Sequence, residues 1–200
     1  MGLELIYAEG QTPLDDDEKE GLLLPFIITR GELDDHEQRN IEGAIRWTME
    51  RRKKFTADEV LSEDFVRQLH VHMFGNVWKW AGNFRNTNKN IGVDKYQVPT
   101  ELRMLLDDCR YWIAEHIFGP DEIALRFKHR LVSIHCFPNG NGRHSRLMAD
   151  VIAEKILGHD FFSWGSRLLA KQGTDRKTYL NALRAADQGD ISLLLEFARS

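Results

Sequence analysis

Apolar residues recur every three or four positions through most of the chain, which is the spacing of an amphipathic α-helix. The clearest stretch runs from Thr100 to about Ile117, and Gly119-Pro120 separates it from another that continues to His135. The same pattern and the N-capping residues predict further helices: from Asp34 or Asp35 to the basic run 51–54, from Ser62 or Asp64 to Phe74, from about Arg143 to Leu157, from Arg176 to Ala186 and from Asp190 to Arg199.

Two segments lack this period. Residues 1–34 are acidic at 15–18 and strongly apolar at 22–28, so we expect an N-terminal arm that packs on the body with little regular structure. Residues 83–98 combine Asn, Arg and Lys with short extended segments, which indicates a small exposed β-hairpin. The predicted fold is all-α: a helical bundle over residues 35–200, with core helices at about 100–158, that carries one hairpin.

Composition is that of an ordinary globular protein, with 42% hydrophobic residues among 200. The net charge of -4 provides no overall basic field, so nucleic acid is not expected as a partner. The two cysteines are too few for a disulfide framework, which suits a reducing compartment. Neither a signal peptide nor a run long enough to cross a membrane is visible, and we expect a cytoplasmic protein.

The stretch from His135 to Arg146 carries the candidate chemistry. Gly140 and Gly142 permit turns that direct backbone N–H groups toward one point, where the N-terminus of the following helix adds its own. Arg143 and Arg146 lie three positions apart on one helix face, so each can bind phosphate oxygens. His135 ends the preceding helix and could accept a proton beside them. The alternative is a glycine-rich helix connection with an incidental histidine.

This stretch resembles a known signature. His135-x-Phe137-x-Asn139-Gly140-Asn141-Gly142-Arg143-x-x-Arg146 is similar to the pattern His-x-Phe-x-(Asp/Glu)-Gly-Asn-Gly-Arg-x-x-Arg of the Fic family. Further similarities lie at Leu69-His70 through Phe74, Trp80-Ala81-Gly82-Asn83-Phe84-Arg85, Ile91-Gly92, Tyr179-Leu180-Asn181-Ala182-Leu183 and Gly189-Asp190. They cover about residues 36–199, and Asn139 with the arm resembles the branch called mobile mystery protein B.

The resemblance implies protein AMPylation, in which AMP passes from ATP to a Ser, Thr or Tyr hydroxyl of a target protein. His135 would be the general base, and Phe137 would anchor the loop. The phosphates would be held by Gly140, Asn141, Gly142, Arg143 and Arg146. The hairpin, with Ile91, Gly92 and Val93, would be a flap that aligns the target backbone. The expected partners are thus a nucleotide and a target protein, and homo-oligomerisation is left open.

Asn139 departs from the pattern, because the family has Asp or Glu there to hold Mg²⁺. Its amide oxygen can bind Mg²⁺ or Mn²⁺ but carries no formal charge, so we expect weaker metal binding and reduced activity.

Glu42 is a candidate inhibitory residue, since residues 38–43 resemble the family's inhibitory segment without its Ser or Thr. Glu42 is therefore either inhibitory or a surface partner of Arg46 at i, i+4.

Three alternatives remain. The protein could bind a nucleotide or peptide with little turnover, or it could transfer a different phosphate-containing group. A metal-dependent HD phosphohydrolase is suggested by His159-Asp160, but this pair follows Gly158, just past a helix end.

The remaining histidines are not expected to bind a metal. His70 and His72 are two positions apart and do not share a helix face, so they are treated as ordinary helix residues. His144 is expected to face solvent.

Overall fold

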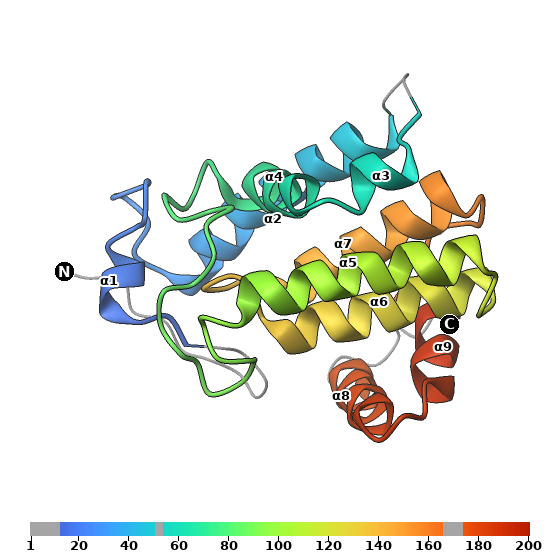
Figure 1. The fold of residues 1–200 in the computed structure, drawn as a ribbon. Helices are drawn as coiled ribbons and strands as arrows, with labels where there is room; N and C mark the ends of the chain where they lie inside the picture. The colour runs from blue at the N-terminus through green and yellow to red at the C-terminus, as the bar shows by residue number, and fades with distance from the viewer. Residues whose placement is uncertain (1–12, 51–53, 166–173) are drawn as a thin grey trace.

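The computed structural model describes residues 13–50, 54–165 and 174–200. These residues form helices (Figure 1): α1 (Asp16–Lys19), α2 (Arg30–Met49), α3 (Ala57–Val60), α4 (Glu63–Phe74), α5 (Val98–Ala114), α6 (Pro120–Ile134), α7 (Asn141–Val151), α8 (Thr174–Asp187) and α9 (Ser192–Arg199). A π-helical turn, η1 (Ile152–Ile156), continues α7. No strand occurs in the described ranges, where an isolated β-bridge pairs Leu22 with Trp78. The all-α prediction is confirmed.

Local capping signals explain where the helices begin. Ser62 caps α4 by accepting a hydrogen bond from the Phe65 amide, and Pro120 occupies the first position of α6, as predicted. Helix α2 begins earlier than the predicted Asp34, because Thr29 and Glu32 form a reciprocal capping box. The last turn of the predicted helix at 51–53 lies outside the described residues.

The helices pack in three groups. Helices α5, α6 and α7 run together through the middle of the molecule, with the α2–α4 pair on one side and the α8–α9 pair on the other (Figure 1). The apolar stripe of α6 is buried as its spacing predicts, with the members Ile123, Ala124, Phe127, Leu131 and Ile134. This arrangement places the C-terminus of α6 and the N-terminus of α7 at the same end of the bundle.

The predicted β-hairpin at 83–98 is wrong. All of these residues are described, and up to the start of α5 they form turns and bends without a strand. Hydrogen bonds from side chains, rather than a backbone hydrogen-bond ladder between strands, order the segment. The Asn88 side chain accepts a hydrogen bond from the Lys95 amide at 2.8 Å and donates one to Asp94 at 2.9 Å. We call residues 86–96 the flap.

The described part of the arm packs on the body through a few residues. Leu14 and Ile27 are buried, whereas Phe26 and Ile28 remain mostly exposed. Backbone hydrogen bonds from Leu23 to Val77 and from Lys79 to Gly21 join the arm to the loop after α4. Although the arm was expected to be irregular, it contains the single helical turn α1.

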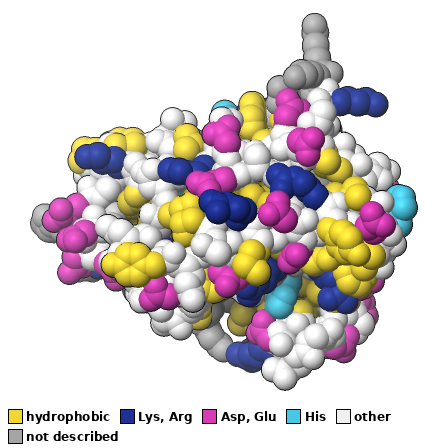
Figure 2. All heavy atoms as spheres, viewed as in Figure 1, with side chains coloured by type: hydrophobic (Ala, Val, Ile, Leu, Met, Phe, Trp, Pro, Cys, Tyr) yellow, Lys and Arg dark blue, Asp and Glu magenta, His cyan; other side chains and the backbone are white. Residues whose placement is uncertain are grey.

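The surface seen in Figure 2 mixes basic and acidic side chains without separating them into two regions. This agrees with the small net charge of -4. Among the helices of the described segments, none has the length and apolar character that crossing a bilayer requires.

Candidate functional site

One cavity of about 970 Å³ collects most of the predicted site residues. Its wall combines the last turn of α6, the first turns of α7, and parts of α2, α8 and the flap. The predicted residues among its lining are His135, Asn139, Gly140, Asn141, Gly142, Arg143, Arg146, Ile91 and Gly92. Three aromatic side chains, Trp164, Tyr179 and Phe197, line it as well. Val93 and Glu42 are outside the lining.

His135 ends α6 in the left-handed conformation, with φ 59° and ψ 61°. Such a backbone costs a residue with a side chain about 1–2 kcal/mol, so neighbouring contacts must hold it. Arg85, which is buried, donates from Nε to the His135 carbonyl at 2.6 Å. The Arg85 amide also donates to the Cys136 carbonyl at 2.9 Å. Arg85 therefore fixes the turn that directs the His135 ring.

The electrostatic setting keeps His135 neutral near pH 7. Its pKa is lowered to about 4, mainly by burial and in addition by the nearby cations Arg85 and Lys89, while the Val132 backbone acts in the opposite direction. Neither ring nitrogen has a close hydrogen-bond partner within the described parts of the chain. A neutral imidazole without such a partner can accept a proton. Negative charge brought in by a bound phosphate would raise its pKa and make it a stronger base.

The loop after His135 gives α7 an open N-terminus. Gly140 is left-handed, with φ +80°, and an added Cβ would lie 2.6 Å from the Phe74 ring, so only glycine fits. A Cβ at Gly142 would meet nothing within 4 Å. The first turn of a helix leaves its backbone N–H groups unpaired within the helix. Since residues 140–143 line the cavity, these donors and the positive end of the helix dipole favour an anion there.

Asn141 has a structural role that differs from the expected phosphate contact. Its buried side chain accepts from the Phe137 amide at 2.9 Å and donates to the Phe137 carbonyl at 2.8 Å. This closes the loop around Phe137, which is fully buried. What Asn141 offers to a ligand is therefore its backbone N–H rather than its amide side chain.

The two arginines have different surroundings. Arg146 lies over the ring of Tyr179, with Cζ 5.4 Å from the ring centroid, and Tyr179 belongs to α8. Arg143 forms an ion pair of 2.6 Å with Glu37 of α2. The Glu37 carboxylate is buried and also accepts from the Trp78 indole at 2.6 Å. Glu37, and not the predicted Glu42, is the carboxylate that pairs with a motif arginine.

Glu42 lies on the same helix but is exposed, and its side chain accepts a hydrogen bond from Gln38 at 3.3 Å. Glu42 is therefore not brought to the cavity. The sequence distance of 106 positions between Glu37 and Arg143 explains why spacing gave no indication of their contact.

Two buried histidines support the loop, and for His144 the expectation that it faces solvent was wrong. His70 Nδ1 accepts from the Gly82 amide at 3.0 Å, so Nε2 carries the hydrogen and donates to the Asn139 carbonyl at 3.1 Å. Its ring also stacks on Phe137 at 3.8 Å. His144 is buried rather than solvent-facing, and its Nε2 contacts the Val66 carbonyl at 2.9 Å. Burial lowers the pKa of both histidines, to about 4 for His144.

The flap lies directly against His135. At Gly92, whose φ is +102°, an added Cβ would lie 2.7 Å from the His135 Cβ. The Val93 amide donates to the Ile134 carbonyl at 3.4 Å, and Arg85 donates to the Val93 carbonyl. Ile91 is largely exposed at the cavity rim. The flap is therefore held at the correct end of the bundle, although it is not a hairpin.

The described residues contain no group of three or more His, Cys, Asp or Glu side chains that could hold a metal ion. His159 instead pairs with Asp121 at 3.2 Å, on a separate small pocket. This removes the basis for the phosphohydrolase alternative. Asn139 lines the main cavity, and its side-chain oxygen accepts from the Gly140 amide at 2.6 Å.

Known proteins share sequence features with this chain. Residues 60–153 match the Fic/DOC family. The protein adenylyltransferase Fic of Aedes aegypti is 27% identical over 154 residues, which is 72% of this chain and 29% of that protein. The protein of the same name from Drosophila erecta is 29% identical over 143 residues, 70% of this chain and 27% of that protein. The chain thus spans less than a third of these curated relatives.

Solved structures agree on the fold. A fragment of Fic-1 from C. elegans superposes with a TM-score of 0.65 at 21% identity, covering 84% of this chain and 48% of that one. The BepC protein of Bartonella tribocorum, solved with bound AMPPNP, gives a TM-score of 0.64 at 15% identity, covering 96% of this chain and 93% of that one. The cavity motif thus lies within the segment, residues 60–153, that matches the Fic/DOC family, and the fold of the chain is the fold of these solved Fic proteins.

Proposed function

We propose that the protein is an adenylyltransferase that moves AMP from ATP to a hydroxyl side chain of a target protein. The observation that carries the proposal is one shared cavity. It presents a neutral His135 imidazole, the open N-terminus of α7 and two arginines. The names of the curated relatives support the same activity, as protein adenylyltransferases.

In the proposed reaction the triphosphate lies over the first turn of α7, where Arg143 and Arg146 neutralise its β- and γ-phosphates. The target hydroxyl gives its proton to His135 while its oxygen attacks the α-phosphorus. The bond from the α-phosphorus to the bridging oxygen breaks, and pyrophosphate leaves. Because the cavity holds base and phosphate site side by side, positioning and charge stabilisation supply most of the rate.

We further propose that residues 91–93 of the flap align the target. Their contact with His135 through Gly92 would bring a bound peptide close to the base. The lack of a preformed strand implies that the peptide contacts turns, or that the flap extends on binding. The division into an arm at 1–34 and a Fic domain at 35–200 stays a prediction, as does the mobile mystery protein B branch.

A divalent metal fits this site only in a limited way. Asn139 would be its protein ligand, through a single neutral amide oxygen that already accepts a hydrogen bond from Gly140. Mg²⁺ or Mn²⁺ would supply charge neutralisation of the phosphates, and most of its ligands would come from the nucleotide and water. The protein's own arginines therefore carry a larger share of the phosphate charge.

The test is transfer of label from ATP. Purified protein is incubated with ATP labelled at the α-phosphate, Mg²⁺ or Mn²⁺ and a cell lysate, beside the His135→Ala variant. We expect a labelled protein band that is reduced by about 10²-fold or more in the variant, the usual contribution of a general base. His159→Ala is the matched control, since His159 lies on the separate small pocket.

Three outcomes would contradict the proposal. Saturable ATP binding without label on any protein would favour the binding-only alternative, for which the neutral Asn139 is the supporting observation. Equal loss in His135→Ala and His159→Ala would remove the role of His135 as base. Label that appears only with a different phosphate-containing donor would keep the fold and change the transferred group.

A further inference from the structure

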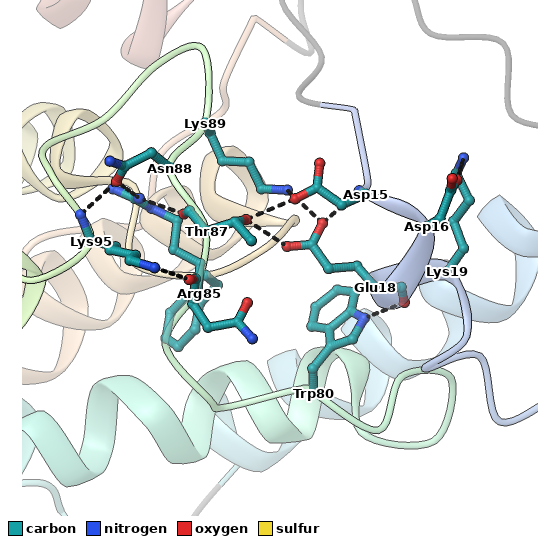
Figure 3. A network of polar contacts seen from close by, with 12 residues as sticks. Asp15, Asp16, Glu18, Lys19, Trp80, Arg85, Thr87, Asn88, Lys89 and Lys95 are labelled. Carbon is teal, nitrogen blue, oxygen red and sulfur yellow. Dashed lines mark hydrogen bonds and ion pairs between the residues drawn. The ribbon is translucent and has the colours of Figure 1, made fainter.

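The arm and the flap are joined by a compact network of charged side chains, drawn in Figure 3. The ammonium group of Lys89 in the flap lies 2.5 Å from the Glu18 carboxylate and 2.8 Å from that of Asp15. The Thr87 hydroxyl also donates to Asp15, at 2.8 Å. Both acidic residues belong to the single turn α1 and its cap, so two segments about 70 positions apart in sequence meet through side chains alone.

The ion pair is buried, which makes it energetically significant. The side chains of Lys89 and Glu18 are 3% and 6% exposed. An ion pair at the surface contributes little, whereas removal of one partner of a buried pair leaves an uncompensated charge in a dry environment. The Lys89 hydrogen bond is the largest cause of the lowered pKa of Asp15. Lys89 is thus an anchor between arm and flap rather than a solvated lysine.

The arm end of the network is itself fixed to the body. The Trp80 indole donates to the Glu18 carbonyl at 2.9 Å, and an added Cβ at Gly21 would lie 2.6 Å from the Trp80 ring. Asp15 and Glu18 also form the capping box of α1, in which the Glu18 carboxylate accepts from the Asp15 amide at 2.8 Å. A four-residue helix is marginal alone, so these contacts hold it in place.

The flap end continues toward His135. Arg85 donates to the Thr87 carbonyl at 2.9 Å and to the His135 carbonyl at 2.6 Å. Residues 87–89, which we call the tip of the flap, are thus held from two sides. Arg85 ties the Thr87 backbone to the body, and the side chains of Thr87 and Lys89 reach α1 and its cap.

We propose that Asp15 and Glu18 are positioning residues for target docking: through Lys89 and Thr87 they hold the tip of the flap and so keep the adjoining Ile91 and Gly92 in place at the cavity. The proposal rests on the proposed function, in which the flap presents a target to His135. Without the two carboxylates, Arg85 still fixes His135 and the Thr87 carbonyl, but Lys89 loses its ion pairs and the tip opens more readily. Target binding therefore weakens, whereas nucleotide binding and the chemistry at His135 are preserved.

The primary test needs neither nucleotide nor target. Amide hydrogen exchange is measured on the full chain across residues 86–96, where the Lys95 and Val93 amides are hydrogen-bonded. In Glu18→Gln and in Lys89→Met we expect exchange of this segment to be at least about tenfold faster than in the wild type, because a local contact that limits opening is lost. Exchange across the central helices α5–α7 should stay within about twofold.

Matched variants separate a specific contact from general charge or folding effects. Asp17→Asn removes the same charge from the same turn, where Asp17 is exposed, and should leave flap exchange unchanged. Lys89→Arg keeps the cation and should restore most of the protection. The proposal is overturned if Glu18→Gln and Lys89→Met leave flap exchange at the wild-type value, or if Asp17→Asn accelerates it equally.

A second measurement links the contact to function. With the protein that becomes labelled in the transfer assay, Glu18→Gln should raise KM for that target by about tenfold while kcat and the Kd of ATP stay within about twofold. A fall in kcat with unchanged KM would contradict a docking role. If the wild type transfers no label, the proposed function fails, while hydrogen exchange still decides whether the arm holds the flap.

Discussion

Asn139 is the residue at which the motif departs from its family's pattern, and its surroundings define a substitution. The residue precedes α7, its carbonyl accepts from His70, and its side-chain oxygen accepts from Gly140. An aspartate would keep that acceptor and add a negative charge next to the phosphate site. Such a charge suits Mg²⁺, which prefers carboxylate together with phosphate oxygens.

We therefore predict that Asn139→Asp raises Mg²⁺-dependent transfer, and that saturation occurs at a lower Mg²⁺ concentration. The measurement is the rate of labelling from α-labelled ATP over a Mg²⁺ titration, with chelator present in a parallel series as the metal-free baseline. A rate that is unchanged or lower in Asn139→Asp across the titration would show that the native amide does not limit metal use.

At this scale the sequence predicted that the motif residues lie together, because they are close in the chain. His135, the glycines and both arginines come to one cavity, since they are neighbours on a helix–loop–helix. Arg85 and His70 were not assigned their roles, although both lie in segments that resemble the family. Their partners, the carbonyls of His135 and Asn139, are 50 and 69 positions away, which no periodicity reveals.

At the scale of elements, helix α2 is the part that most alters the expected site. It brings Glu37 against Arg143, so that one of the two arginines proposed to bind phosphate is already in an ion pair. Glutamine at this position would still accept from the Trp78 indole but would no longer attract the guanidinium. The helix was predicted from its apolar face, but which carboxylate it directs inward depends on packing against α4 and α7.

We predict that Glu37→Gln tightens ATP binding by about tenfold, because Arg143 no longer divides its charge between Glu37 and phosphate. Calorimetric titration with ATP measures this, and thermal unfolding shows whether the variant keeps its fold. Glu42→Gln is the matched control on the exposed face of α2 and should not change the Kd. Weaker binding in Glu37→Gln would instead mean that Glu37 holds Arg143 in its binding position.

Most helices were predictable because the sequence features that define them are local: N-capping residues, the Gly-Pro pair that ends one helix and begins the next, and the spacing of apolar residues. The exceptions have a physical reason. Helix α2 begins before the predicted Asp34 or Asp35, because the capping box of Thr29 and Glu32 stabilises an earlier start. The hairpin was wrong because the polar segment is ordered by side chains such as Arg85 and Asn88 rather than by a backbone ladder.

For the whole molecule, buried neutral histidines make stability depend on pH. His70, His135 and His144 have folded-state pKa values below the ordinary 6.5, to about 4 for the latter two, because burial disfavours the charged ring. Between pH 6.5 and about 4, these histidines are therefore protonated in the unfolded chain but remain neutral in the folded chain. As pH falls through that window, His135 and His144 each lower the free energy of unfolding by about 1.4 kcal/mol per pH unit, and His70 acts in the same direction.

We predict that the free energy of unfolding by urea falls from pH 7 to pH 4.5, with the steepest part below pH 6.5. One group acts the other way. Asp150 has its pKa raised to about 6 by burial, so the folded chain binds its proton first and gains stability as pH falls through 6. Replacing His144 with Gln should reduce the proton uptake on unfolding by about one, so the free energy of unfolding should depend less steeply on pH. An unchanged pH dependence in that variant would contradict the lowered pKa of His144.

Under the proposed function, the tight packing of the flap against His135 limits how the preference for a target could change. Gly92 has no room for a side chain, and Arg85 commits its hydrogen bonds to the base of the loop. Variation is tolerated where side chains point outward, at Asn90, Ile91 and Tyr96. A library that randomises only these exposed positions should therefore yield folded proteins with altered peptide preference, whereas diversity at Arg85 or Gly92 would mostly yield proteins with a displaced base.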